Sequence, residues 1–226
     1  MYQSRRPDLY RAALTRLQVD GLAYPCACSR QEIAETASRH SIDGGLVYPG
    51  TCRNGLRAGV AARAWRLRVP DQEMVCRDRI HGEARQSLAR DVGDFVLLRA
   101  DGQYAYQLAV VVDDAHQGVN AVVRGADLLD STHRQIWLQQ CLALPGPSYA
   151  HLPVAVNAAG EKLSKQSKAA AVDPAAGADA LYRALRFLGQ DVPPDAARGS
   201  LPAFWRCAVD CWDIGRVPAV RAIFPG

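Results

Sequence analysis

Lysine is scarce in this chain of 226 residues, which carries 27 basic side chains but only three lysines. They stand at Lys162, Lys165 and Lys168, inside a single stretch of seven residues, and the other 24 basic residues are arginines. The net charge is only +4. This mild basic excess permits a polyanionic partner without requiring one.

Other absences narrow the class of protein. The chain has no run of about 18 apolar residues, so no membrane span is expected. The N-terminus has no apolar stretch behind Arg5 and Arg6, so no secretory signal is expected. Seven cysteines, an odd number, speak against a secreted disulfide framework and favour a reducing cytoplasm. Internal repeats and low-complexity tracts are also missing. What remains is a globular chain of one domain or a domain and a half.

The stretch Gly160–Gln166 contains two of the three lysines. Lysine is a compact point charge on a flexible stem, which suits it to follow a phosphate through a reaction, whereas arginine is a rigid planar fork. A solvated surface loop is the alternative interpretation. The concentration of every lysine beside small residues favours a loop that handles phosphate.

Three cysteines form the only close cysteine group: Cys26, Cys28 and Cys52. Two thiolates on a turn and a third from a second loop can build a tetrahedral zinc site, although free cysteines also serve as small buried hydrophobes. A closed site needs a fourth ligand. His40 is favoured as the fourth ligand because histidine is the commonest nitrogen ligand of zinc, and Tyr48 is a less usual choice. The residues themselves leave both open.

The predicted elements alternate between helices and strands. The capping box of Ser29 and Glu32 and the other helix signals predict helices over 7–21, 29–38, 131–144, 177–188 and 202–214. Apolar runs predict strands over 64–69, 74–80, 94–99, 119–124 and 151–157. The segment 82–92 reads as an irregular connection, and 106–114 fits either a buried strand or a buried helix. The alternation indicates a nucleotide-binding α/β domain.

Arg124 and Asp127 end the strand predicted over 119–124. Open α/β sheets place ligand contacts at such strand ends, and the alternative is a surface salt bridge between the two residues. His151 is a lone histidine beside apolar residues, for which a structural role is favoured over catalysis. Cys207 and Cys211 lie four apart on a predicted helix, where core packing is favoured over ligation.

Three segments together resemble a known family. Lys162-Leu163-Ser164-Lys165-Gln166 resembles the KMSKS signature of class I aminoacyl-tRNA synthetases. Tyr106–Asp114 and Val123–Leu128 resemble the matching segments of the glutamate-specific branch. The resemblance implies an incomplete Rossmann-like α/β catalytic domain over 1–157, with a zinc-binding insertion at about 22–60. Residues 158–226 would then hold the lysine loop and a helical region that contacts an RNA stem.

The most similar members of that branch are short paralogues. Gln166 in place of arginine, the short segment after the lysine loop and the cysteine pattern all favour them. This resemblance implies ATP-dependent activation of glutamate and its attachment to the queuosine base in the anticodon of tRNA(Asp). A non-catalytic remnant that binds tRNA or a nucleotide is the alternative. A zinc-stabilised fold with neither activity would leave the clustering of lysines unexplained.

The resemblance also implies roles for single residues. Tyr106 and Arg124 would contact glutamate. Lys165 would bind ATP and stabilise charge on the departing pyrophosphate, with Lys162 assisting. The paralogues' zinc site has a tyrosine as its fourth ligand, which moves the preference from His40 to Tyr48 and implies structural Zn²⁺ held by Cys26, Cys28, Tyr48 and Cys52. ATP would enter with Mg²⁺, and the partners would be glutamate and tRNA(Asp) bearing queuosine. A cytoplasmic monomer without membrane contact is expected.

The chain departs from the family at its start. Family members open with a strand and a HIGH-type motif that hold the ATP phosphates, and no H-x-G-H occurs here. Met1–Arg6 corresponds to a segment well inside the family's nucleotide-binding domain. We therefore expect an N-terminally truncated form that lacks half of the phosphate cradle, through a start codon assigned too late or through a real truncation.

Overall fold

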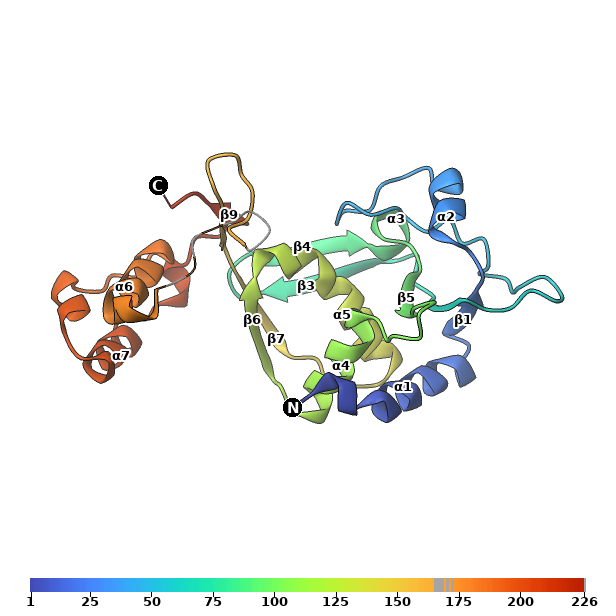
Figure 1. The fold of residues 1–226 in the computed structure, drawn as a ribbon, viewed down its shortest axis with the longest axis horizontal. Helices are drawn as coiled ribbons and strands as arrows, with labels where there is room; N and C mark the ends of the chain where they lie inside the picture. The colour runs from blue at the N-terminus through green and yellow to red at the C-terminus, as the bar shows by residue number, and fades with distance from the viewer. Residues whose placement is uncertain (165–168, 170, 172, 226) are drawn as a thin grey trace. The chain divides into compact units, whose positions relative to one another are not determined.

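The computed structural model describes residues 1–164, 169, 171 and 173–225 (Figure 1). The chain divides into two compact units, each built from separated stretches. Unit 1 comprises residues 1–76, 83–121 and 130–147, and unit 2 comprises residues 77–82, 122–129 and 148–226. Lys165 and Lys168 lie outside the described residues.

The core of unit 1 is covered by helices. They are α1 (Pro7–Val19), α2 (Arg30–Thr36), α3 (Leu88–Asp91), α4 (Tyr106–His116) and α5 (Thr132–Cys141). Pro7 starts α1, where its fixed φ suits the first turn and its missing N–H is not needed. Leu14 and Leu17 then point into the core from one face. Helix α4 packs against both α1 and α5 (Figure 1).

A three-stranded antiparallel sheet in unit 1 has the order β1 (Ala23–Cys26), β2 (Ala64–Leu67), β5 (Phe95–Leu98). Strand β1 lies at the edge, where Pro25 is tolerated because an edge N–H need not be paired. Arg66 lies between the apolar residues Trp65 and Leu67 of β2. A register shift between Trp65 and Arg66 turns the arginine inward, and it is only 8% exposed.

A four-stranded sheet has the order β4 (Gly82–Ser87), β3 (Glu73–Asp78), β7 (Ser148–Leu152), β6 (Ala121–Gly125). Strands β3 and β7 run parallel, with Asp78 opposite Tyr149. The segment 82–92 is therefore not irregular, because it forms β4 and α3. The prediction failed there because β4 is mostly exposed and carries few apolar residues.

The ambiguous valine-rich segment is the helix α4. Its buried face includes Leu108, Val111 and Asp113. The Asp113 carboxylate accepts hydrogen bonds from the Gln3 side chain, Arg6 Nε and the Tyr10 hydroxyl at 2.7 to 3.0 Å. A buried acid needs such partners, and the hydrogen bonds from Arg6 and Tyr10 join Asp113 of α4 to the start of α1.

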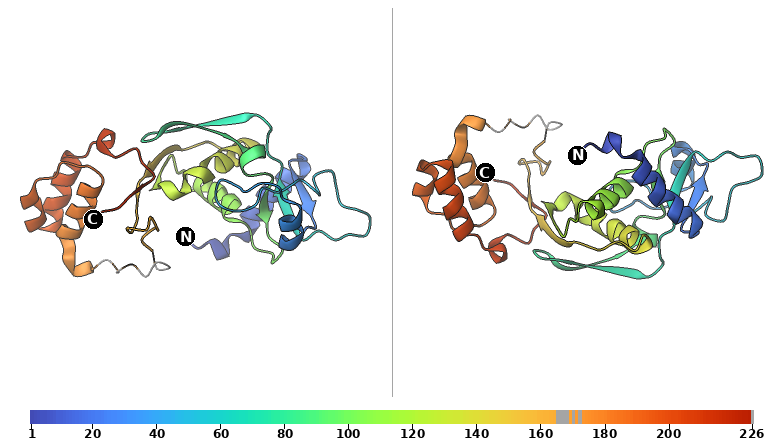
Figure 2. Two further views of the ribbon diagram at one scale, coloured as in Figure 1. Left: turned by 90° about the horizontal axis from the view of Figure 1, so that it is seen from above. Right: turned by 90° about the horizontal axis from the view of Figure 1, so that it is seen from below.

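Unit 2 contains two helices that lie side by side, α6 (Gly177–Phe187) and α7 (Leu201–Asp210) (Figure 2). Their core includes Val192 and Phe204. Cys207 and Cys211 pack against it with sulfurs 3.9 Å apart, as the sequence predicted. The strand predicted over 151–157 breaks into β7 and β8 (Val154–Ala155), and β8 pairs in parallel with β9 (Ala222–Ile223).

Short 3₁₀ segments connect these elements: η1 (Gln3–Arg5), η2 (Ala126–Ser131), η3 (Pro174–Ala176), η4 (Pro194–Arg198) and η5 (Ile214–Arg216). In the described part of the chain, no helix has both the length and the apolar character that crossing a bilayer requires.

Replacing Gly93 by alanine is expected to destabilise unit 1 by about 2 to 4 kcal/mol. Gly93 has a φ of 75°, and an added Cβ would lie 2.8 Å from the backbone nitrogen of Tyr48. Gly102→Ala is the matched control, because its φ is 79° but nothing lies within 4 Å of the added atom. It should cost only about 1 to 2 kcal/mol. Equal shifts of the urea unfolding midpoint for both variants would contradict the steric argument.

Candidate functional site

The three predicted cysteines meet in unit 1. Cys26 ends β1, Cys28 precedes α2, and Cys52 comes from the following loop. Their sulfurs all lie within 4.8 Å of one another, and those of Cys28 and Cys52 are 3.5 Å apart. A tetrahedral zinc site with Zn–S bonds of about 2.3 Å has sulfurs about 3.8 Å apart. The cluster is therefore able to hold a metal ion.

Tyr48 completes the group. Its buried hydroxyl lies 3.4 Å from Cys26 Sγ and 3.5 Å from Cys28 Sγ, and it accepts a hydrogen bond from the Cys52 backbone N–H at 2.9 Å. These spacings suit the fourth corner of the tetrahedron. His40 is exposed, and its backbone bridges to Leu46. The metal-capable group found among the described residues does not include His40.

Arg66 lies directly behind the cluster. Its guanidinium carbon is 3.8 Å from the centre of the Tyr48 ring, and its Nε donates to Cys26 Sγ at 3.3 Å. Burial raises the pKa of the Cys28 thiol to about 11 and also raises the pKa of Tyr48. A bound metal must displace these protons. Arg66 would offset part of the negative charge that results.

In unit 2, a buried relay holds Arg124 at the end of β6. Arg124 Nε donates to His151 Nε2 at 3.0 Å, and His151 Nδ1 lies 2.7 Å from a carboxylate oxygen of Asp78. Since Nε2 accepts, the imidazole proton is on Nδ1 and is donated to Asp78. His151 is fully buried, and this burial lowers its pKa, while the Asp78 hydrogen bond opposes the shift. The predicted structural role of His151 fits this position.

The segment after Arg124 reaches the lysine loop. Asp127 pairs with Lys162 through a 2.6 Å contact between Oδ2 and Nζ. Gly125, between Arg124 and Asp127, leaves room for the Asp127 carboxylate, because an added Cβ would lie against that carboxylate and 3.0 Å from Val154. Lys162 and Arg124 therefore belong to one connected part of unit 2.

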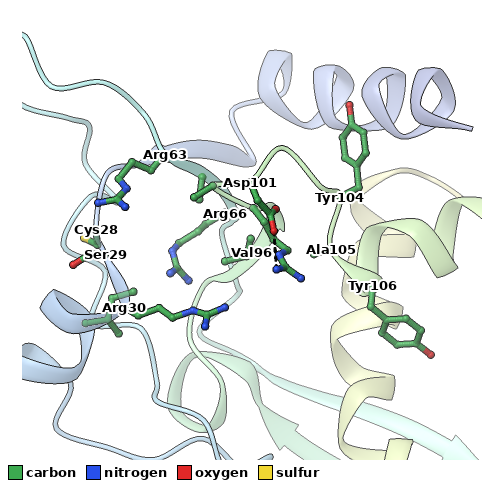
Figure 3. A pocket seen from close by; sticks show the side chains of 14 residues that line it. Cys28, Ser29, Arg30, Arg63, Arg66, Val96, Asp101, Tyr104, Ala105 and Tyr106 are labelled. Carbon is green, nitrogen blue, oxygen red and sulfur yellow. Dashed lines mark hydrogen bonds and ion pairs between the residues drawn. The ribbon is translucent and has the colours of Figure 1, made fainter. Parts of the chain in front are cut away.

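Tyr106 is the first residue of α4 in unit 1, and it is 49% exposed (Figure 3). Its predicted partner in glutamate binding, Arg124, lies in unit 2. Lys165 falls outside the described residues. The roles of Tyr106, Arg124, Lys162 and Lys165 stay predictions.

A profile of the family described as "tRNA synthetases class I (E and Q), catalytic domain" matches residues 1–186. The chain belongs to this family. Its predicted relation to class I synthetases is thereby confirmed. Among curated relatives, the glutamyl-Q tRNA(Asp) synthetase of Dechloromonas aromatica is 61% identical over 96% of this chain and 72% of its own length. The protein of the same name from Chromobacterium violaceum is 58% identical over 97% of this chain and 72% of its own length.

Solved structures agree on the fold. The crystal structure of glutamate-tRNA synthetase from Elizabethkingia anophelis matches with a TM-score of 0.73 at 20% identity. A glutamate tRNA ligase from Elizabethkingia meningosepticum, solved in complex with its amino acid, matches with 0.71 at 21% identity. Each match covers 98% of this chain but only 52% and 51% of the other. The predicted α/β fold class of a class I synthetase catalytic domain is confirmed.

Sequence reasoning missed two contributors to these sites, Arg66 and Asp78. Asp78 lies within a predicted strand and 73 residues from His151. Nothing in the spacing of one chain pairs two residues so far apart. A single arginine between two apolar strand residues carries no signal that it is buried.

The metal site is testable by zinc content. Purified protein is expected to hold one zinc per chain, and Cys52→Ser should lose it and melt at a lower temperature, because a closed structural site contributes folding free energy. Tyr48→Phe should keep three thiolates and bind zinc more weakly in competition with a chelator. His40→Ala serves as control and should retain full zinc. Loss of zinc in His40→Ala, with full retention in Tyr48→Phe, would instead make histidine the fourth ligand.

The tautomer of His151 provides a second test. Because its pKa is lowered, the folded state holds fewer protons than the unfolded state below about pH 6.5, so stability is lost as the pH falls through that value. Nitrogen-15 NMR at pH 7.5 should show His151 neutral with its proton on Nδ1, and its titration midpoint should lie below that of the unfolded chain. The same residue in the urea-unfolded chain should titrate near pH 6.5. A charged His151, or one protonated on Nε2, would contradict the relay.

Proposed function

We propose that this chain activates glutamate with ATP and transfers it to the queuosine base in the anticodon of tRNA(Asp). The main support is the name of its relatives, glutamyl-Q tRNA(Asp) synthetase, at 61% and 58% identity over nearly the whole chain. The chain spans about 72% of the length of these relatives. We further propose that it acts as a monomer in the cytoplasm.

Glutamate binding would centre on Arg124. A guanidinium recognises a carboxylate through two parallel hydrogen bonds. His151 holds Nε of Arg124 at 3.0 Å, and the Leu128 carbonyl accepts from Nη2 at 3.4 Å. An arginine held at two points has little rotamer freedom left to lose, so ligand binding costs less entropy. Tyr106 would supply a further polar contact to the substrate.

Activation joins glutamate to the α-phosphate of ATP. A carboxylate oxygen of glutamate attacks the α-phosphorus while the bond to pyrophosphate breaks, and Mg²⁺ accompanies the nucleotide. Lys165 would stabilise the negative charge on the departing pyrophosphate, and Lys162 would assist. The ion pair between Lys162 and Asp127 supports this role, since it ties the base of the lysine loop to the segment that carries Arg124. Transfer then releases AMP as a group on queuosine attacks the activated carbonyl.

A bound zinc ion would have a structural role. Cys26, Cys28, Tyr48 and Cys52 would fill all four positions of a tetrahedral ion, which leaves no open position for a substrate or water. The ion would fix the loop that carries Cys52 against β1 and the start of α2. The ion would act as a crosslink between these three segments.

Glutamate-dependent exchange between ATP and pyrophosphate tests the activation step. Arg124→Ala is expected to lower kcat/KM for glutamate by at least about 100-fold, and Arg124→Lys should restore little, because a point charge cannot replace the fork. Lys165→Ala should lower kcat. Arg198→Ala is the matched control, since Arg198 is exposed on η4 of the same unit. Unchanged exchange in Arg124→Ala would remove this residue from the substrate site.

A further inference from the structure

Two cysteines at the end of α7 take no part in the sites described above. Cys207 lies in the last turn of the helix, and Cys211 is its C-terminal cap. Both pack against the core between α6 and α7 in unit 2, yet each keeps a partly exposed surface (Figure 1). Their sulfurs lie 3.9 Å apart. The rim of this small core therefore presents two neighbouring thiols.

A direct disulfide between these cysteines does not suit the helix. Side chains four residues apart on a helix have Cβ atoms about 5 to 6 Å from each other, whereas a disulfide needs about 3.5 to 4.5 Å. Closing that gap would distort the last turn of α7, which is intact, since the Cys211 N–H donates to the Cys207 carbonyl at 2.9 Å. The pair is better suited to a bridge through a third atom.

The spacing of the sulfurs fits a metal ion as that third atom. With zinc–sulfur bonds of about 2.3 Å, two sulfurs 3.9 Å apart subtend an angle of about 116° at the ion. This angle is close to the tetrahedral value that Zn²⁺ adopts in protein sites. The two thiols of α7 are thus already placed as two corners of a zinc tetrahedron.

The surroundings of Cys207 and Cys211 favour a cation. The C-terminal end of a helix carries a partial negative charge, and Cys211 caps that end of α7. Burial and the hydrogen bond with Cys211 raise the pKa of Cys207, and the negative charges of Asp195 and Asp210 add to the rise. Neither carboxylate pairs with a basic side chain in the part of the chain that the structure describes. Negative charge that opposes a bare thiolate stabilises a divalent cation bound to it.

We propose that Cys207 and Cys211 form a second metal site, which binds Zn²⁺ through two thiolates. Each thiol gives up its proton, so one Zn²⁺ replaces two protons and the net charge of the site is unchanged. Among the described residues, no third histidine, cysteine or acid joins the pair in a metal-capable group, so water fills the remaining positions. Two protein ligands hold an ion less tightly than four do. The ion therefore exchanges readily, binds after the cysteine cluster is filled, and is lost on desalting.

Zinc counting by equilibrium dialysis tests the site, with the 226-residue chain kept reduced in buffered free Zn²⁺. The parent is expected to rise from about one zinc per chain at low free Zn²⁺ to about two at saturation. Cys207→Ser and Cys211→Ser should each stop at about one. Cys141→Ser is the matched control and should reach about two, because Cys141 is a partly exposed cysteine at the end of a ten-residue helix, as Cys207 is, but has no sulfur beside it.

Two further measurements identify the ligands. Co²⁺ added to the chain that already holds zinc in its cysteine cluster should give a thiolate-to-cobalt charge-transfer band in the parent and none in Cys207→Ser. In the unsubstituted parent, saturating Zn²⁺ should slow alkylation of Cys207 and Cys211 by iodoacetamide at least about tenfold, because a metal-bound thiolate is no longer a free nucleophile. Alkylation of Cys141 should keep its rate.

The serine variants should keep the circular dichroism of the parent, since serine differs from cysteine by one atom. If one of them fails to fold, protection from alkylation in the parent decides. Saturation of the parent at one zinc, a second zinc that persists in Cys207→Ser, or alkylation that Zn²⁺ does not slow would each overturn the proposal. The outcome is independent of the proposed function, because no step of the test involves glutamate, ATP or RNA.

Discussion

Buried carboxylates with several donors each are the constraint on which both units depend. Asp113, Asp94 and Asp78 are at most 5% exposed. Each has at least one partner from a distant part of the chain. Asp113 pairs with Gln3, Arg6 and Tyr10, and Asp94 pairs with Tyr24, Arg53 and the Val69 N–H. Asp78 pairs with the distant His151 and with the nearby Ile80 and His81 N–H groups. An unpaired buried charge is strongly unfavourable, so each carboxylate fixes the elements that satisfy it.

The same principle links the fold to the candidate sites. The Asp94 carboxylate accepts a hydrogen bond from the Tyr24 hydroxyl, and the Asp94 backbone carbonyl accepts one from Arg66. Arg66 in turn packs on the Tyr48 ring and donates to Cys26 Sγ. In unit 2, Asp78 orients His151, which in turn holds Arg124. In unit 2 the interior acid thus sets the position of an arginine through His151, and in unit 1 the backbone carbonyl of Asp94 holds Arg66 directly.

Local sequence signals predicted much of this structure. The capping box of Ser29 and Glu32 marks α2, and Pro7 marks the start of α1, because these signals act within one turn of helix. The cysteine cluster was predictable because only a few kinds of side chain can act as zinc ligands. The strand β4 was missed because exposed strands bury too little apolar surface to show a period. The pairs Asp78–His151 and Arg66–Tyr48 join residues far apart in sequence, and no local pattern encodes them.

The interleaving of the two units has a consequence for how the protein is made. Unit 1 takes its last segment from residues 130–147, and unit 2 needs residues 77–82 together with everything after 147. On the ribosome, Asp78 therefore emerges 73 residues before the histidine that satisfies it. Every segment of unit 1 precedes residue 148, whereas unit 2 needs the last 79 residues of the chain as well as two short segments that are made much earlier. Synthesis from the N-terminus therefore lets unit 1 fold first, while residues 77–82 and 122–129 wait for the rest of unit 2.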